Sequence, residues 1–432
     1  MLNRIVDMLN RSESVDEWLV SDKKIESSEL FFVGSSLDMN RSKQVRHISV
    51  TVYKNFVSDG KEYKGSANTK LSPAMTQNEI AAKIEQAALA ATFVKNPYYE
   101  LAEPTDELIK HVESKFDSDA LSSHLPKIVK SLYKRDEYEN GQVNSCEFFL
   151  EKVDTRIRNS RGIDEQFSSY KGQIELVVDW KETGEEVEII EIIDFSDLNS
   201  GKIEQIVADT LDNARLRAKA LPMPKLSDIP VLLVKENVNE FLRYYIEKSN
   251  VSLVYQKYSD AKIGESLQGE EGEGDRLNIT LLPEIEGSVM SRYIDEDGVK
   301  LHERELMKNG VLRRYHGDNR HSQYLGVNPT GVIGNVSVKG GSQVFAQFKE
   351  DPYLELRYFS DFQMDEWTGD FGGEIRLAIY HDGESKTPVT GGSIVGNIKD
   401  VQSDMLLSKE LQQSGNYICP RGIKLFGVTV VD

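Results

Sequence analysis

The spacing of apolar residues predicts both strands and helices in the first part of the chain. In HISVTVYKNF, apolar and polar positions alternate, and Asp59-Gly60 follows as a hairpin turn. Thr76 and Glu79 have the spacing of a capping box, which marks the start of a helix. The apolar positions that follow recur at helical spacing: Ile80, Ile84, Ala87, Ala88 and Ala91.

A second set of elements precedes the clearest boundary in the chain. Strand-like alternation between about residues 125 and 195 leads to a helix predicted from Ser200 to Leu221. The stretch LPMPKLSDIP then carries three prolines in ten residues, which favours a linker between domains. We therefore predict an α+β protein with a mixed α/β domain over 1–222 and a β-rich domain over 230–432.

The second domain opens with PVLLVKENVNEFLRYYIEKS, a short buried strand followed by an amphipathic helix. Asn237 with Glu240 predicts a capped helix start. The apolar face of that helix consists of Val238, Phe241, Leu242, Tyr245 and Ile246. The remainder is strand-rich, with a hairpin turn predicted at Asn309-Gly310.

Charge and hydropathy narrow the classes of function. The 432 residues include 52 basic and 71 acidic side chains, a net charge of −19, which argues against broad binding of nucleic-acid phosphates. No run of 18 apolar residues occurs, and the first residues lack a secretory apolar core. We therefore expect a cytoplasmic protein with no membrane association.

Histidines and cysteines give no convincing metal motif. His302-Glu303 resembles the start of a helical zinc signature, but it precedes a predicted strand and hairpin, and the residues one turn later are Leu306 and Met307. His316 and His321 lie in a stretch that is typical of a turn, and no acidic or sulfur residue nearby completes a ligand set. The two cysteines, Cys146 and Cys419, are far apart in sequence, and we interpret Cys419 as a small buried residue.

Three blocks near the C-terminus carry a stronger signal. They are Thr368-Gly369-Asp370-Phe371, Thr387-Pro388-Val389 and Gly396-Asn397-Ile398-Lys399-Asp400, followed by the final RGIKLFGVTVVD. In this order and at this spacing they resemble the C-terminal signature of the TldD/PmbA family, and the resemblance covers about residues 225 to 432. It nominates Thr368, Gly369, Asp370, Phe371, Gly396 and Asn397 as signature or peptide-binding positions.

The resemblance implies a role beside a catalytic partner. In that family, TldD-type subunits bind zinc through a His-Glu-x-x-x-His helix and a cysteine, whereas TldE (PmbA)-type subunits lack these ligands. An ungapped comparison from Pro230 places Arg243, Tyr244 and Lys248 at the motif positions. A guanidinium cannot ligate zinc, and an ammonium repels it. We therefore expect no catalytic residue and no metal in this chain, with zinc in a TldD-type partner that forms a heterodimer with it.

Two alternatives stay open at this point. The expected function is that of a non-catalytic subunit, inactive alone, which helps to enclose and bind extended or unfolded peptides for proteolysis or peptide maturation. The first alternative is a DNA gyrase-modulating or nucleic-acid-associated protein, as an older family name implies. The second is a self-sufficient metallopeptidase or hydrolase with an atypical site, for which Asp370, His381 and Asn397 are candidates. Whether the chain forms a homodimer without its partner is also left open.

Overall fold

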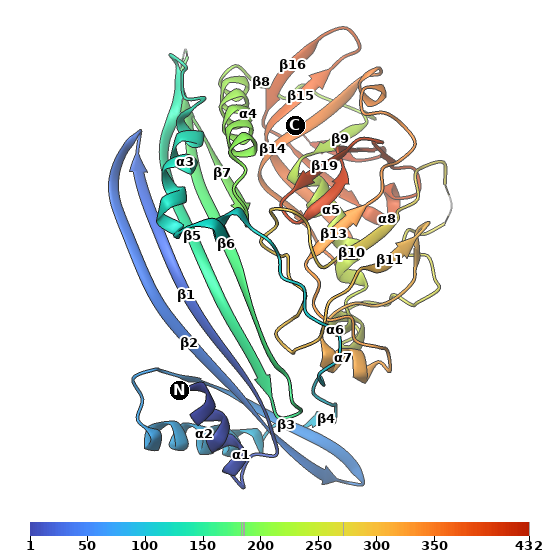
Figure 1. The fold of residues 1–432 in the computed structure, drawn as a ribbon. Coiled ribbons are helices and arrows are strands. Elements are labelled where there is room, and N and C mark those ends of the chain that lie inside the picture. Colours follow the sequence, from blue (N-terminus) through green and yellow to red (C-terminus); the bar gives the residue numbers. More distant parts are fainter. Residues whose placement is uncertain (183, 185, 271, 432) are drawn as a thin grey trace.

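The computed structural model of the chain describes residues 1–182, 184, 186–270 and 272–431. It confirms the α+β class, with a long, strongly curved sheet in the first half and two sheets of shorter strands with helices in the second (Figure 1). Among the described residues, no helix is both long enough and apolar enough to cross a membrane.

The first half is built on a seven-stranded sheet in which neighbouring strands are antiparallel. Its order is β4 (Asn96–Pro97), β3 (Lys61–Leu71), β2 (Ser36–Ser58), β1 (Glu17–Val33), β5 (Gly141–Asn159), β6 (Asp164–Trp180) and β7 (Val187–Phe195). The predicted turn at Asp59-Gly60 joins β2 to β3, and both residues have the positive φ values that this turn requires (53° and 69°). The hairpin prediction is therefore confirmed.

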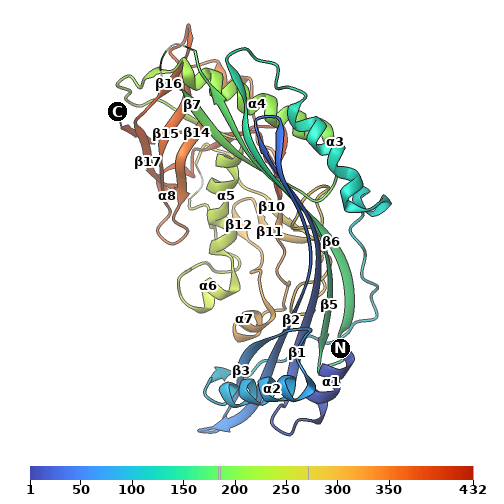
Figure 2. The same cartoon turned by 90° about the vertical axis from the view of Figure 1, so that its left-hand side faces the viewer.

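Helices cover the two ends of this sheet. They are α1 (Leu2–Arg11), α2 (Gln77–Ala91), α3 (Leu121–Tyr133) and α4 (Ser200–Ala218), with a 3-10 turn η1 (Lys115–Ser118). On β1, Val20 packs in the core with α1 and α2, whereas Leu30 and Phe32 pack in the core with α3 and α4. Figure 2 shows α2 at one end of the sheet and α3 and α4 at the other. Helix α2 has the predicted capping box and buried face, and α4 begins as predicted.

Two further sheets form the second half. One has the order β12 (Val311–Leu312), β11 (Arg304–Lys308), β10 (Ile279–Leu282), β13 (Asn335–Val338), β20 (Tyr417–Pro420) and β19 (Leu411–Ser414). The other has the order β18 (Leu406–Leu407), β21 (Gly422–Leu425), β9 (Val231–Val234), β14 (Tyr353–Met364), β15 (Asp370–His381), β16 (Lys386–Thr390) and β8 (Leu221–Pro222). In addition, β17 (Ser393–Asn397) pairs with β15 and with β22 (Thr429–Val431).

The helices of the second half are α5 (Glu236–Lys248), α6 (Val251–Tyr255), α7 (Asn319–Tyr324) and α8 (Ile398–Val401), with a 3-10 turn η2 (Gln347–Lys349). The predicted apolar face of α5 is buried, but the predicted cap is wrong. Strand β9 runs directly into α5 through Lys235, so Asn237 lies inside the first turn and donates to the Leu356 carbonyl. The Glu240 carboxylate accepts from the Met364 backbone and from Arg243.

The two halves have separate cores. The buried residues of the two clusters that pack on the long sheet all precede residue 215, and Tyr358 of the second half packs against one of these clusters. The buried residues of the largest cluster lie between 229 and 428. The proline-rich stretch lies between these sets. Its first residues, Leu221 and Pro222, pair with β16 and so belong to a sheet of the second half.

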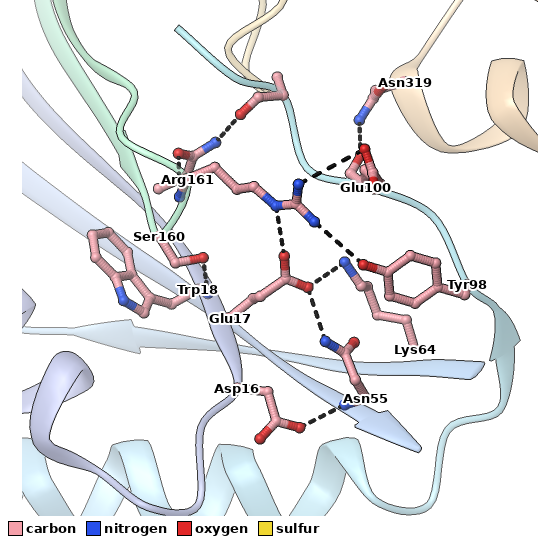
Figure 3. A network of polar contacts seen from close by, with 12 residues as sticks. Asp16, Glu17, Trp18, Asn55, Lys64, Tyr98, Glu100, Ser160, Arg161 and Asn319 are labelled. Carbon is pink, nitrogen blue, oxygen red and sulfur yellow. Dashed lines mark hydrogen bonds and ion pairs between the residues drawn. The ribbon is translucent and has the colours of Figure 1, made fainter. Parts of the chain in front are cut away.

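A buried set of charged residues, which we call the Glu17 network, fastens the base of the long sheet (Figure 3). The Glu17 carboxylate forms an ion pair with Lys64 and another with Arg161, whose Nε lies 3.1 Å from Oε1, and it accepts from Asn55 at 3.2 Å. The Lys64 side chain has no solvent exposure and lies 4.7–5.5 Å from the ring centres of three tyrosines. Those rings belong to Tyr53, Tyr98 and Tyr99.

The network also reaches the second half of the chain. Arg161 forms an ion pair with Glu103 at 3.0 Å, and the Glu100 carbonyl nearby accepts from Asn319 at 2.7 Å and from Gln323 at 2.8 Å. Burial opposes ionisation of Glu17, but the hydrogen bonds from Lys64, Asn55 and Arg161 outweigh it and lower the pKa of the carboxyl. The ionised network therefore helps to hold the two halves together.

Candidate functional site

Arg243, Tyr244 and Lys248, which stand at the positions of the zinc motif and which we call the degenerate motif positions, lie within one turn and a half of helix α5. Because its apolar face is buried between β14 and the core, Arg243 is turned towards the protein surface, and its side chain is 38% exposed. Tyr244 and Lys248 lie close to the buried boundary, at 4% and 6% exposure. The three residues therefore differ in environment although they are neighbours on one helix.

Arg243 is held by carboxylates and by one carbonyl. Its guanidinium lies 2.8 Å from Glu240 Oε1 and 3.6 Å from Glu366 Oε2, and it donates to the Met364 carbonyl at 3.2 Å. The hydrogen bond with Glu240 raises the pKa of Arg243, so the guanidinium keeps its charge. Three of its five N–H donors are thus already used by protein acceptors.

Lys248 is enclosed more tightly. Its Nζ lies 3.2 Å from Asp260 Oδ1 and 5.8 Å from the centre of the Tyr244 ring. The hydrogen bond from Lys248 lowers the pKa of Asp260, whose side chain is 95% exposed. The ammonium group therefore has one carboxylate partner at the surface and an aromatic face beside it.

A cavity opens beside Arg243. It measures about 610 Å³ and lies between α5 and the turn that joins β14 to β15. We call it the α5 cavity; its lining residues are Arg243, Gln363, Met364, Asp365, Glu366, Trp367, Asp370, Phe371 and Gly372. Trp367 is 53% exposed and stacks on Tyr258, itself 52% exposed, with ring centres 5.2 Å apart. An exposed aromatic pair beside a cavity suits the binding of apolar or cationic side chains.

The Thr368–Phe371 block shapes this turn. Gly369 has φ +86°, and a Cβ there would lie 2.8 Å from Ile398 and 3.4 Å from both Asn397 and Tyr244. Only glycine fits such a backbone without strain. The block is thus packed against both α5 and the start of α8.

The Gly396-Asn397 block secures the same turn from the other side. Asn397 donates to Asp370 Oδ1 at 2.8 Å and to the Thr368 carbonyl at 3.2 Å, and it caps α8 by accepting from the Lys399 amide. A Cβ at Gly396 would lie 2.5 Å from the Phe371 ring. The structure therefore brings the signature positions and the degenerate motif positions into one place, and it gives the signature residues a structural task there.

These residues do not fit a zinc ion. Arg243 and Lys248 are ion-paired cations, and Tyr244 Cε2 faces the packed Gly369 rather than an open coordination space. Cys419 lies on β20, is fully buried and contacts Asn239 Oδ1 at 3.3 Å, and burial raises its pKa to about 12. Within the described part of the chain, no group of three or more histidine, cysteine, aspartate or glutamate side chains is placed to hold a metal.

The histidines are separated as well. His302 precedes β11, as predicted, and contacts Glu107 at 3.3 Å. His316 is buried, and its Nε2 lies 2.8 Å from the Ile246 carbonyl, whereas His321 Nδ1 lies 2.8 Å from Asp318. The stretch that contains His321 is helix α7, capped by Asp318, so the prediction of a turn there is wrong.

The atypical hydrolase site is not assembled. Asp370 and Asn397 do meet, but Asp370 and His381 are the first and last residues of β15. At the rise of an extended strand they are roughly 36 Å apart. The expectation of a site formed by Asp370 and His381 is therefore wrong. The two residues lie in one strand, and an extended strand holds its two ends apart.

Sequence reasoning missed several residues of the site. Tyr258 and Asp260 follow α6, and Glu366 and Trp367 lie in the β14–β15 turn, far from α5 in sequence. The available signal was Trp367, one of three tryptophans, which directly precedes the Thr-Gly-Asp-Phe block in a turn rather than in a strand.

Comparison with known proteins defines the class. Residues 227–432 match the family described as PmbA/TldA metallopeptidase C-terminal domain. A zinc metalloprotease TldD homolog of Saccharolobus solfataricus is 29% identical over 218 residues, 45% of this chain and 47% of that protein. Metalloprotease PmbA of Escherichia coli O157:H7 is 24% identical over 216 residues, 48% of this chain and 47% of that protein. The chain thus spans about half the length of these two relatives.

The whole fold is also known. The crystal structure of TldE from Thermococcus kodakarensis superimposes with a TM-score of 0.80 at 16% identity, and the match covers 100% of both chains. At that identity the likeness establishes the fold, while the match over 227–432 and the sequence relatives establish the relationship. Residues 227–432 therefore belong to the TldD/PmbA family.

Proposed function

We propose that this chain is the non-catalytic, TldE/PmbA-type subunit of a zinc metallopeptidase heterodimer, in which it encloses and binds extended peptides. The observation that carries the proposal is the state of helix α5. At the positions where a TldD-type helix would present two histidines, this chain has an ion-paired guanidinium and a buried ammonium. Neither group ligates zinc or activates water at neutral pH.

The α5 cavity supports the peptide-binding part of the proposal. It is open and about 610 Å³ in volume, and its rim carries the exposed Trp367–Tyr258 pair. Aromatic side chains bind peptides with little loss of conformational entropy because few of their torsions must be fixed. The lining has three carboxylates against one guanidinium, from Asp365, Glu366, Asp370 and Arg243. Such a lining favours uncharged or basic peptide segments over acidic ones.

The test is reconstitution. The purified chain, a TldD-type subunit and their mixture are each given an unstructured protein substrate, and cleavage is followed by mass spectrometry. We expect no cleavage by this chain alone and faster cleavage by the mixture than by the TldD-type subunit alone, with a 1:1 complex visible by gel filtration. Cleavage by this chain alone, after treatment with a metal chelator, would refute the proposal.

A further inference from the structure

A second cavity lies where the base of the long sheet meets helix α7. It measures about 310 Å³, far more than the roughly 10–15 Å³ that one water molecule needs. Figure 1 shows α7 beside β4 at the lower end of the long sheet, and Tyr324 of α7 donates to the Pro97 carbonyl at 2.8 Å. We call it the junction cavity, because its lining includes Thr51, Tyr53 and Tyr99 of the first half and Asp297, Asp318 and Arg320 of the second.

The first half contributes a wall of two buried tyrosines. Tyr53 and Tyr99 are 5% and 8% exposed, and their rings meet edge to face with their centres 6.3 Å apart. The Nζ of Lys64 lies 5.5 Å and 4.9 Å from the two ring centres, so the Glu17 network helps to hold the rings in place. Burial raises the pKa of both phenols, that of Tyr53 to about 12. Both hydroxyls therefore stay protonated at neutral pH and can donate to a ligand.

The second half contributes two opposite charges that are not paired with each other. Asp297 lies in the loop between β10 and β11, and Arg320 lies in the first turn of α7. Both line the junction cavity, yet neither forms an ion pair with a described residue. The guanidinium of Arg320 instead lies 3.4 Å from His321 Nε2. The nearby Asp318 carboxylate accepts from the His321 amide at 2.9 Å and lies 2.8 Å from Nδ1 of the same ring, so Asp318 is already engaged.

Asp297 lacks a cation close enough to offset its burial. Burial raises the pKa of its carboxyl to about 6, and the charges of Asp295 and Asp318 add to this rise. The amide of Asn319 and the charge of Arg320 oppose the rise only in part. A ligand cation beside Asp297 would therefore stabilise the ionised carboxylate, while the Arg320 guanidinium keeps donors for a ligand anion.

The two charges and the two hydroxyls surround one space. The charges of both Asp297 and Arg320 act on the pKa of Tyr53 and on that of Tyr99, so all four side chains are near one another. A ligand with only a negative charge would be repelled by Asp297, and a ligand with only a positive charge would be repelled by Arg320. The ligand that is complementary to this lining carries both charges.

We propose that the junction cavity binds a small zwitterion, either a free amino acid or a dipeptide, with its ammonium group at Asp297 and its carboxylate at Arg320. The hydroxyls of Tyr53 and Tyr99 donate to the oxygen atoms of the ligand. This inference does not rest on the proposed peptidase role, because none of these residues lines the α5 cavity.

Calorimetry with matched ligands tests the proposal on the native chain. The probe is L-alanyl-L-alanine, compared with its N-acetyl derivative, which lacks the ammonium group, and its C-terminal amide, which lacks the carboxylate. Each derivative should bind at least about tenfold more weakly, because it leaves one charge of the cavity without a partner. L-alanine is measured as well: tighter binding than that of the dipeptide assigns the cavity to free amino acids, and weaker binding assigns it to dipeptides. Equal affinities for the dipeptide and both derivatives, or no binding of any ligand, would overturn the proposal.

Two variants test which residue meets which end of the ligand. Arg320→Gln should bind the dipeptide and its amide equally, and Asp297→Asn should bind the dipeptide and its N-acetyl derivative equally. Arg313→Gln is the matched control, because Arg313 is exposed and lies outside the cavity, and it should behave as the native chain does. Thermal unfolding establishes that each variant is folded. Native discrimination between the ligands in both Arg320→Gln and Asp297→Asn would contradict the assignment.

Discussion

The Glu17 network and the α5 cavity both gather acidic and basic side chains, yet water reaches them to very different extents. In the network, the Lys64 side chain is fully buried and the Glu17 side chain is 11% exposed. In the cavity, Arg243 is 38% exposed and its partner Glu366 is 27% exposed. The first cluster joins strands of the long sheet to the segment 98–103 and, through Glu100, to α7, while the second lines an open space.

This difference in exposure distinguishes charged side chains that stabilise the fold from charged side chains that are available to bind a ligand. A buried charge without its partner is expensive, so buried clusters are complete and tolerate little change. Half-exposed ion pairs contribute little to stability, so their residues are free to serve recognition. By this criterion the Glu17 network is structural, whereas the α5 cavity is the place to look for a ligand.

The largest effect is expected at Glu17. Glu17→Ala leaves Lys64 buried without its carboxylate, which should lower the free energy of unfolding by roughly 3–5 kcal/mol. Chemical denaturation measures this directly. The control is Glu265→Ala, which removes an exposed pair with Lys262 at 3.5 Å and should cost about 0.5 kcal/mol or less. An equal loss of unfolding free energy in the two variants would show that the buried network is no more important for stability than an exposed ion pair.

A carboxylate whose desolvation outweighs the attraction of a nearby cation, Lys235, should show the opposite pH dependence. Burial raises the pKa of Glu191 on β7 to about 7, and the charges of Glu236 and Asp209 add to the effect. The folded carboxyl keeps its proton up to about pH 7, while the unfolded one loses it near 4.5, so stability falls as pH rises through this window. Glu191→Gln should remove on the order of 2 kcal/mol of that fall.

The matched control for this variant is Glu188→Gln on the exposed side of the same strand. It should reproduce the native dependence of stability on pH between 4.5 and 7. For Glu17 the dependence of stability on pH has the opposite sign. Its pKa is lowered in the folded chain, so stability is lost as pH falls below the pKa that the carboxyl has in the unfolded chain. An unchanged slope in Glu191→Gln would show that this carboxyl is ionised in the folded chain.

A smaller, local effect is expected at Trp367. Trp367→Ala removes the exposed half of the stacked pair and should weaken binding of a labelled unstructured peptide by about tenfold, or about 1.4 kcal/mol. Fluorescence anisotropy of the native and variant complexes gives the comparison. Phe93→Ala is the control, because Phe93 is 81% exposed and lies outside the α5 cavity. Equal peptide affinities of the native chain and Trp367→Ala would show that the peptide does not bind in the α5 cavity.

The smallest effect is expected at Asp370. In Asp370→Asn the new amide oxygen still accepts from Asn397, so the turn keeps its geometry. Activity of the reconstituted complex should change by less than about twofold, since a retained hydrogen bond alters little. A loss of a hundredfold or more would revive a catalytic role for this carboxylate.

Sequence alone predicted the local elements well. The α2 capping box, the Asp59-Gly60 and Asn309-Gly310 turns and the apolar face of α5 follow from short-range rules, and the structure confirms them. The predictions of a cap at Asn237 and of a turn around His321 are wrong because tertiary context decides both: β9 leads directly into α5, and Asp318 caps α7, a helix of only six residues. Periodicity cannot detect so short a helix.

The site was predicted in parts but not as a whole. The comparison with the family gave Arg243, Tyr244 and Lys248, and the signature blocks gave Gly369 and Asn397. The sequence did not show that these two sets of residues lie side by side. Their contact depends on the pairing of β14, β15 and β17, which brings the β14–β15 turn to α5. The ion-pair partners Glu366 and Asp260 come from separate loops, for which no pattern of spacing exists.

The most direct test of the central claim is the zinc content of the purified chain, alone and mixed with a TldD-type subunit. Because Arg243 and Lys248 are ion-paired cations, we predict no stoichiometric zinc in the chain alone and one zinc in each complex. Zinc measured by mass spectrometry at one per chain in the isolated protein would contradict the account. It would mean that the metal-binding helix is not α5 and that the catalytic question returns to this subunit.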